Sequence, residues 1–368
     1  MRPSKFLGRV DARAGQRGFS LIEIMIGVVI GLIAILVIYQ VFAASEGLKR
    51  NTTSAGDAQQ NGLLASFMLG VELSNASNGV AMAWKQLDSC PTAATTAATT
   101  LRPIPILITA GGGLTLPDSF VVNYSTSNNV IAPAPFKAAS ASNAPYVVHA
   151  PLGFRLGDVV VAVSGGSFGA GTCAISSVTA VSAPTAGCGP PGPDVCGGWV
   201  TIGHTNAPFA FTDDAFLLNM GPGTAAQRVL YDVDLTSNAL RSSLLWDANG
   251  APVATPTPNP LASNIVNMKL LYGIDSDGDG YLDAWVAPTG AWSAANLLVA
   301  PAATLRQIKA VRLGIIVRGE QWDRNAPDVT ALLFRDAIPF TQSFPAAGGN
   351  YRYRWYETII PMRNPVWN

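Results

Sequence analysis

The sequence predicts an α+β protein in which one long N-terminal helix packs on an antiparallel β-sheet with long insertions. An apolar run near the N-terminus is followed by a helical pattern that reaches about residue 79, and short β-rich runs come after it. No helical pattern follows each strand in turn, which excludes a doubly wound parallel sheet. We expect four parts: residues 1–18, an apolar helix over 19–44, its amphipathic continuation over 45–79, and a β-rich globular domain over 80–368.

Charge is distributed unevenly along the chain. The formal net charge of the 368 residues is zero, and only 12% of them are charged. The first 18 residues carry +4, from Arg2, Lys5, Arg9, Arg13 and Arg17 against one aspartate, so the remainder carries −4. A chain without a basic field is not expected to bind nucleic acid.

The apolar run is long enough to cross a bilayer. No charged side chain occurs from Ile24 to Tyr39, and a span needs roughly 20 residues. Basic residues before the run predict a cytoplasmic N-terminus and an exported remainder. A secretory signal cut near Ala44 has too long an apolar core here, and a plain signal anchor explains neither Gly18 nor Glu23.

A resemblance to a known family explains both residues. The stretch Arg17-Gly18-Phe19-Ser20-Leu21-Ile22-Glu23 resembles the leader junction of type IV pilins and type II secretion pseudopilins. The resemblance implies that a prepilin peptidase cuts after Gly18, that Phe19 becomes the N-methylated N-terminus, and that Glu23 serves assembly. An acid in the hydrocarbon costs about 2.5 to 3.5 kcal/mol, which the amine of Phe19 from a neighbouring subunit would offset. Snorkelling of Glu23 to the interface is the simpler alternative.

Four cysteines follow the apolar run, at Cys90, Cys173, Cys188 and Cys196. Disulfides are expected in an exported chain, but the sequence does not choose among three pairings. Cys188 and Cys196 flank a turn-forming run that a bond between them would close. A zinc site is disfavoured because no C-x-x-C motif occurs.

Local patterns predict the elements that follow the membrane segment. The helix is expected to loosen around residues 51–53, to turn Leu64, Phe67, Met68 and Val71 toward the sheet, and to end between Asn75 and Gly79. Strands are predicted at Phe120–Tyr124, Asp158–Val163, Trp199–Ile202, Arg228–Val233, Ala239–Leu245, Ile265–Tyr272, Val311–Val317 and Arg352–Ile360. Loops are predicted at Cys90–Thr100, Asn128–Pro145 and Ala254–Pro260.

An acidic loop after one of these strands predicts a calcium site. Asp275, Asp277, Asp279 and Asp283 occupy positions 1, 3, 5 and 9 of an EF-hand-type loop, and Tyr281 would offer its backbone carbonyl at position 7. Four acids this close repel one another unless a hard cation neutralises them. Val286 replaces the bidentate glutamate of position 12 and a strand precedes the loop, so a complete EF-hand is not expected. A solvated Asp-Gly turn is the alternative.

A G-x-S-x-G motif at Gly165–Gly169 suggests a different class, a membrane-anchored serine hydrolase. Ser167 would be the nucleophile, with Asp194 and His204 downstream. The nucleophile should open a helix, but a turn and a strand are predicted after it. A glycine-rich hairpin is therefore the favoured interpretation, and no catalytic residue is expected.

The C-terminal half narrows the resemblance. Three stretches are similar to PilW-type minor pilins. They are Tyr272–Ile274 running into the acidic loop, Ile308–Arg318, and a final Tyr-Arg strand that ends in Ile359–Asn364. Aromatic and arginine side chains alternate in Tyr351–Trp355, which predicts a strand with aromatics on one face. Residues 80 to 260 resemble nothing that we can name.

The resemblance implies a non-catalytic assembly protein. Such a pilin would be held in the inner membrane with its bulk in the periplasm, and in the pilus after assembly. Its partners would be other minor and major pilins and a PilY-type tip adhesin. A J-type pseudopilin of type II secretion is the alternative, and motility, adhesion or DNA uptake are the functions that a pilus would serve.

Overall fold

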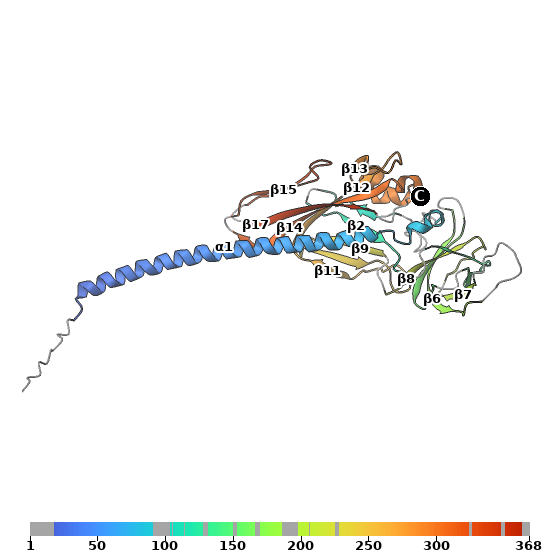
Figure 1. The fold of residues 1–368 in the computed structure, drawn as a ribbon, viewed down its shortest axis with the longest axis horizontal. Helices are drawn as coiled ribbons and strands as arrows, with labels where there is room; N and C mark the ends of the chain where they lie inside the picture. Colours follow the sequence, from blue (N-terminus) through green and yellow to red (C-terminus); the bar gives the residue numbers. More distant parts are fainter. Residues whose placement is uncertain are drawn as a thin grey trace, which may run out of the picture. The chain divides into compact units, whose positions relative to one another are not determined.

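A computed structural model describes residues 18–90, 104, 106–113, 115–127, 132–149, 153–165, 170–185, 198–205, 207–224, 228–323, 326–346 and 350–362. The chain forms two compact units, Met1–Thr53 and Ser54–Asn368, which we describe separately. Helix α1 (Leu21–Asn75) contributes residues to both units, and the strands belong to the second (Figure 1). The fold is α+β with a pilin-like N-terminal helix, as the sequence predicts.

The predicted loosening of α1 around residues 51–53 is wrong. The backbone is helical through all three residues. The hydroxyl of Thr52 donates to the carbonyl oxygens of Leu48 and Lys49, at 3.1 and 2.9 Å, and so finds its partners inside the helix. A threonine satisfied in this way lowers helix propensity only slightly, and it does not end the helix.

The end of α1 falls at Asn75, inside the predicted range. Ser77 and Gly79 adopt positive φ angles of 62° and 70°, which a helix cannot continue through. The Ser77 N–H donates to the Asn123 carbonyl at 2.7 Å, which ties this turn to strand β2 (Ser119–Asn123). A Cβ on Gly79 would lie 2.6 Å from that of Ser125, so the close approach also favours glycine there.

The prediction of which apolar stripe of α1 packs on the sheet is wrong. Leu64, Phe67 and Val71 are 47%, 70% and 44% exposed. The buried stripe is instead Ala58, Ala65, Leu69, Leu73 and Ala76, each fully buried. Both stripes have helical spacing, but small side chains in the second let the sheet approach the helix closely.

Gly62 shows how close this approach is. A Cβ at Gly62 would lie 2.1 Å from the Tyr356 ring, whereas one at Gly56 would meet nothing within 4 Å. We expect Gly62→Ala to destabilise the protein by about 1 to 3 kcal/mol through overpacking. Gly56→Ala should stabilise it by about 0.5 to 1 kcal/mol through helix propensity. Thermal unfolding of the two purified variants measures the difference, and equal effects would contradict the packing described here.

Two antiparallel sheets share the core that α1 covers. The first has the order β1-β2-β9-β10-β11, and the second β13-β12-β14-β17. The remaining strands of these sheets are β1 (Ile106–Thr109), β9 (Arg228–Asp234), β10 (Ala239–Leu244), β11 (Pro258–Ala262), β12 (Ile265–Ile274), β13 (Ala284–Val286), β14 (Ile308–Asp323) and β17 (Asn350–Pro361). Side chains from both sheets join Leu69 and Leu73 in one hydrophobic cluster.

The opposite face of the second sheet is covered by a hairpin. Strands β15 (Val329–Leu333) and β16 (Phe340–Phe344) pair with each other. Leu333 and Phe334 cluster with Ile316 of β14, and Phe344 stacks on Tyr353 of β17 at 3.9 Å between ring centroids. Two short helices, α3 (Ala294–Val299) and α4 (Ala302–Leu305), complete the connection between β13 and β14.

The middle of the chain forms a small closed β-barrel. Its strand order is β3-β8-β5-β6-β7-β4, all antiparallel. The bonds Lys137 N–H to Val147 O (2.7 Å) and His149 N–H to Pro135 O (2.9 Å) join the two end strands. These strands are β3 (Ala134–Pro135), β4 (Tyr146–Val148), β5 (Asp158–Val163), β6 (Cys173–Val181), β7 (Val200–His204) and β8 (Phe216–Pro222). In the described part of this module, each end strand therefore has a partner on both sides.

A disulfide and an apolar cluster hold the barrel to the segment after α1. Cys90 and Cys173 are bonded, with 5.5 Å between their Cα atoms. Val159 and Val161, on the outer face of β5, pack with Leu87 of α2 (Trp84–Leu87). Figure 1 shows the barrel strands β6, β7 and β8 at the end of the second unit away from β15.

All eight predicted strands are present. The ends of seven lie within two residues of the prediction, whereas β14 begins three residues earlier and ends six residues later than predicted. The predicted loop Ala254–Pro260 is partly wrong, because Pro258 begins β11. An edge strand accepts proline, since its outward N–H makes no bond in the sheet. The predicted loop Asn128–Pro145 is interrupted by β3, and most of Cys90–Thr100 lies outside the described residues.

Candidate functional site

The predicted leader junction lies directly before α1. Gly18, Phe19 and Ser20 precede the helix, and the Ile24 N–H donates to the Ser20 carbonyl at 3.1 Å, one turn into it. Phe19 is 80% exposed, and Glu23 is an exposed acid in the first helical turn. A carboxylate there is favoured by the positive end of the helix dipole.

The helix after this junction presents apolar side chains on all sides. Met25, Val37 and Phe42 are 60%, 51% and 71% exposed within the first unit. By length and composition, α1 is the one helix among the described residues that is able to cross a membrane. A helix that is apolar all round requires a lipid or protein environment.

The acidic loop connects β12 to β13. Asp275 follows the last residue of β12 and is only 2% exposed, and its N–H donates to the Gln307 carbonyl at 2.8 Å. The Asp283 N–H donates to the Ile274 carbonyl at 2.9 Å, closing the loop at its base. The position of both acids is therefore fixed by the sheet.

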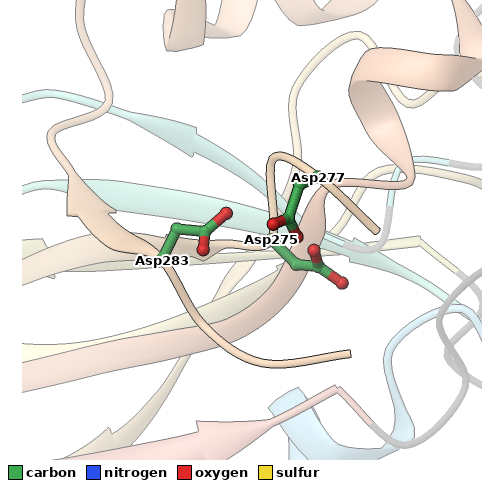
Figure 2. Close-up of side chains that lie close together, drawn as sticks. All are labelled: Asp275, Asp277 and Asp283. Atoms are coloured by element: carbon green, nitrogen blue, oxygen red, sulfur yellow. The ribbon is translucent and has the colours of Figure 1, made fainter. Parts of the chain in front are cut away.

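Three of the four predicted acidic ligands converge. Asp275, Asp277 and Asp283 each offer a carboxylate oxygen, and these oxygens all lie within 4.8 Å of one another. Figure 2 shows Asp283 on one arm of the loop, with its carboxylate turned toward Asp275 and Asp277 on the other. Carboxylate oxygens at this spacing suit a hard cation such as Ca²⁺.

The carboxylate of Asp279, the fourth predicted acid, is not part of this group. The Asp279 carboxylate accepts the Tyr281 N–H at 2.8 Å, and the Tyr281 side chain is 77% exposed. Gly278 and Gly280 donate their N–H groups to Asp275, at 2.7 and 3.1 Å. The loop thus uses its glycines to wrap around the buried aspartate.

Charge around the cluster is only partly balanced. Lys309 Nζ lies 4.0 Å from the Asp275 carboxylate, and it is the cation that the described residues place there. The Ser276 hydroxyl and N–H both donate to Asp283 and hold the pKa of its carboxyl below the usual value. Three ionised carboxylates beside one ammonium leave excess negative charge, which a divalent cation would neutralise.

The structure gives no support to the serine hydrolase. Ser167 and Asp194 lie outside the described residues. His204 stacks on Tyr146 at 3.9 Å between ring centroids, and its two ring nitrogens lie 2.6 and 2.9 Å from the carbonyl oxygens of Thr205 and Ala144. A histidine held by two carbonyls inside the barrel is a structural residue.

The four cysteines are only partly described. Of the three pairings that the sequence left open, the structure contains Cys90–Cys173. Cys188 and Cys196 lie outside the described residues. The bond joins the end of the helical segment to β6, which local spacing did not indicate.

The Tyr-Arg strand is β17. Tyr353 packs against the hairpin, while Arg352 pairs with Asp323 of β14 at 3.0 Å. Trp355 is 40% exposed, and Trp367 lies outside the described residues. The predicted separation of aromatic and basic faces therefore holds for part of the strand.

Two protein-family models match parts of the chain. Residues 13–39 match the prokaryotic N-terminal methylation motif, and residues 230–364 match the family of Type IV Pilus-assembly protein W. These two matches support a PilW-type type IV minor pilin. No curated protein and no solved structure matches it significantly.

The PilW match covers the second sheet, the acidic loop and the β15–β16 hairpin. The barrel, β3 to β8, lies outside both matches. The methylation-motif match and the PilW match thus fall on the two regions that the sequence singled out, and the barrel is a separate module between them. The family is one of structural pilin-type proteins.

Proposed function

We propose that this protein primes type IV pilus assembly at the inner membrane and then lies at or near the pilus tip, together with other minor pilins and a PilY-type adhesin. The observation that carries the proposal is the union of a prepilin junction with a PilW-type β-domain in one chain. Neither part supplies a catalytic constellation among the described residues. Assembly is therefore the activity that both parts support.

Each part of the helix has a role in this proposal. Residues 19–42 hold the subunit in the membrane while the bulk lies in the periplasm, and they enter the filament core after extraction. Cleavage after Gly18 removes five basic side chains and creates an amine on Phe19. Glu23 of the neighbouring subunit then meets an opposite charge in place of hydrocarbon.

Counting and labelling pili tests the position in the filament. A strain without this gene should carry few or no pili, and complementation should restore them. An epitope tag on the restored protein should then be found by immunogold at pilus ends. Label spread along the shaft, or normal piliation without the gene, would contradict the proposal. A defect confined to protein secretion would favour the J-type pseudopilin.

We also propose that the acidic loop binds calcium through Asp275, Asp277 and Asp283. The buried Asp275 anchors the site and the two exposed acids close it. Bound calcium would fix the link between β12 and β13 and so stiffen one edge of the second sheet. Extracellular calcium modules typically bind with Kd values of about 0.1 to 1 mM, a range suited to an exported protein.

Calcium titration of the purified, chelator-treated full chain checks this proposal. We expect binding heat and, at about 100 times Kd, a stabilisation of about 2.7 kcal/mol. Asp277→Asn should abolish most of the effect. Asp279→Asn is the matched control in the same loop, and it should retain binding because that carboxylate lies outside the cluster. No heat and no stabilisation of the natural chain would sink the proposal.

A further inference from the structure

The two sheets under α1 have four edge strands, and three of them are protected. The outward N–H of Ile108 in β1 donates to the Tyr272 hydroxyl at 2.7 Å. Strand β11 carries Pro258 and Pro260, and β13 has only three residues. Strand β17 has twelve residues and no proline before its last position. Long unprotected edges are rare because they pair with other chains.

The register of β17 shows which backbone groups face outward. Met362 N–H donates to the Lys309 carbonyl at 2.9 Å, and the next pairs are Pro361 with Ala310 and Ile360 with Val311. In an antiparallel ladder, alternate residues turn both backbone groups toward the partner strand. Trp355, Glu357 and Ile359 therefore direct their N–H and C=O groups away from β14. No described backbone group pairs with them.

An apolar groove runs beside this edge. Its volume is about 380 Å³, and it is lined by Phe67 and Val71 of α1 and by Ile359 and Pro361 of β17. Phe67 and Ile359 are 70% and 53% exposed. Phe67 and Val71 belong to the helix stripe that the sequence predicted to pack on the sheet. Within the second unit they face a space that an added strand would fill.

The charged side chains of β17 limit which kind of strand can pair with its free edge. Arg354 is exposed and forms no ion pair with another described residue. Glu357 already accepts from Arg312 at 2.8 Å, so it does not balance Arg354. A second copy of β17 would bring a like-charged strand to this edge, and like charges across a strand pair are unfavourable. An acidic partner strand is favoured instead.

We propose that the free edge of β17 is the docking site for an extended strand of a different protein subunit. That strand adds to the second sheet by backbone hydrogen bonds, places an apolar side chain over Phe67 and Val71, and presents an acid to Arg354. This is recognition by strand addition, in which the backbone supplies affinity and the pockets supply specificity. The surface deepens the proposed assembly function, on which it rests, by giving one subunit contact.

Photocrosslinking in the native membrane tests the contact. A photoreactive residue replaces Trp355 in one strain and Ile359 in another, both in the full chain. We expect adducts with one partner protein, mapped by mass spectrometry to one segment at points about four residues apart. Adducts scattered over a partner, adducts in a helical segment, or no adduct would overturn the proposal.

A proline substitution tests the backbone bonds directly. Ile359→Pro removes an outward N–H but no bond to β14, and Ile359→Val is its matched control. The adduct from position 355 should fall about threefold to tenfold in Ile359→Pro, the loss expected from one hydrogen bond, and persist in Ile359→Val. Equal adduct yields in the two variants would overturn the proposal, provided that thermal unfolding shows both to be folded.

The crosslinks are read only on chains whose leader has been removed. An unprocessed natural chain would therefore refute the proposed assembly function, while a processed chain without adducts would refute only the strand-docking site.

Discussion

Replacing Glu23 by alanine is expected to spare membrane insertion and leader cleavage but to reduce incorporation into pili by about tenfold or more. Glu23 lies in the first turn of α1, where the apolar helix has no other acid before Glu46. Replacing this carboxylate stabilises the membrane-inserted state, because no acid then lies in the hydrocarbon. It also removes the partner of the Phe19 amine in the filament. Both changes favour the membrane-inserted subunit over the subunit in the filament.

The measurement compares membrane and pilus fractions by quantitative immunoblot, with processing read from the mobility of the mature chain. Glu46→Ala is the matched control, since Glu46 forms an exposed pair with Arg50 at 3.4 Å beyond the apolar run. Exposed pairs of this kind contribute little. Normal incorporation of Glu23→Ala would show that Glu23 only snorkels to the interface.

Replacing Cys90 by alanine is expected to destabilise the second unit by about 2 to 5 kcal/mol. The bond from Cys90 to Cys173 spans 83 positions of sequence, so its loss frees a long loop in the unfolded chain. It also opens the cluster in which Leu87 and Val161 pack around Cys90. The barrel should therefore loosen from the segment after α1.

Thermal unfolding with and without a reductant measures this effect. Reductant should lower the unfolding temperature of the natural chain by more than that of Cys90→Ala, which already lacks this bond. Cys173→Ala should behave as Cys90→Ala does, and the double variant should lose no further stability, because all three lack the same bond. A natural chain insensitive to reductant, or additive losses in the double variant, would contradict the pairing.

Local patterns predicted the long helix, the eight strands and the acidic loop because each depends on neighbouring residues. The run Asp158–Val163 is β-branched throughout its centre and became β5 with the same bounds. The close spacing of the loop aspartates placed them together without knowledge of the fold. Only the structure shows that Asp279 lies outside the cluster that Asp275, Asp277 and Asp283 form.

The barrel escaped prediction because contacts distant in sequence create it. Strands β3 and β4 have two and three residues, too few for any periodic pattern. Strand β8 contains Asn219, whose side-chain amide donates to Gly153 O and to Asp158 at 2.8 and 2.9 Å. A polar residue satisfied across the barrel looks like a loop residue in the sequence.

The helix stripe was misassigned for a related reason. Two stripes of α1 share the helical period, and hydrophobicity favours the one with Phe67 and Val71. The sheet instead selects Ala58, Ala65 and Leu69, since small side chains admit the ring of Tyr356 at Gly62. Shape complementarity between distant elements decided the outcome, and it also left the groove beside β17.

The mature N-terminus tests the central claim most directly. Mass spectrometry of the protein isolated from membranes or pili should find a chain that begins at Phe19 and carries one N-methyl group. A chain that begins after Ala43 or Ala44 would make residues 1–44 an ordinary secretory signal and would contradict the account of this protein as a pilin.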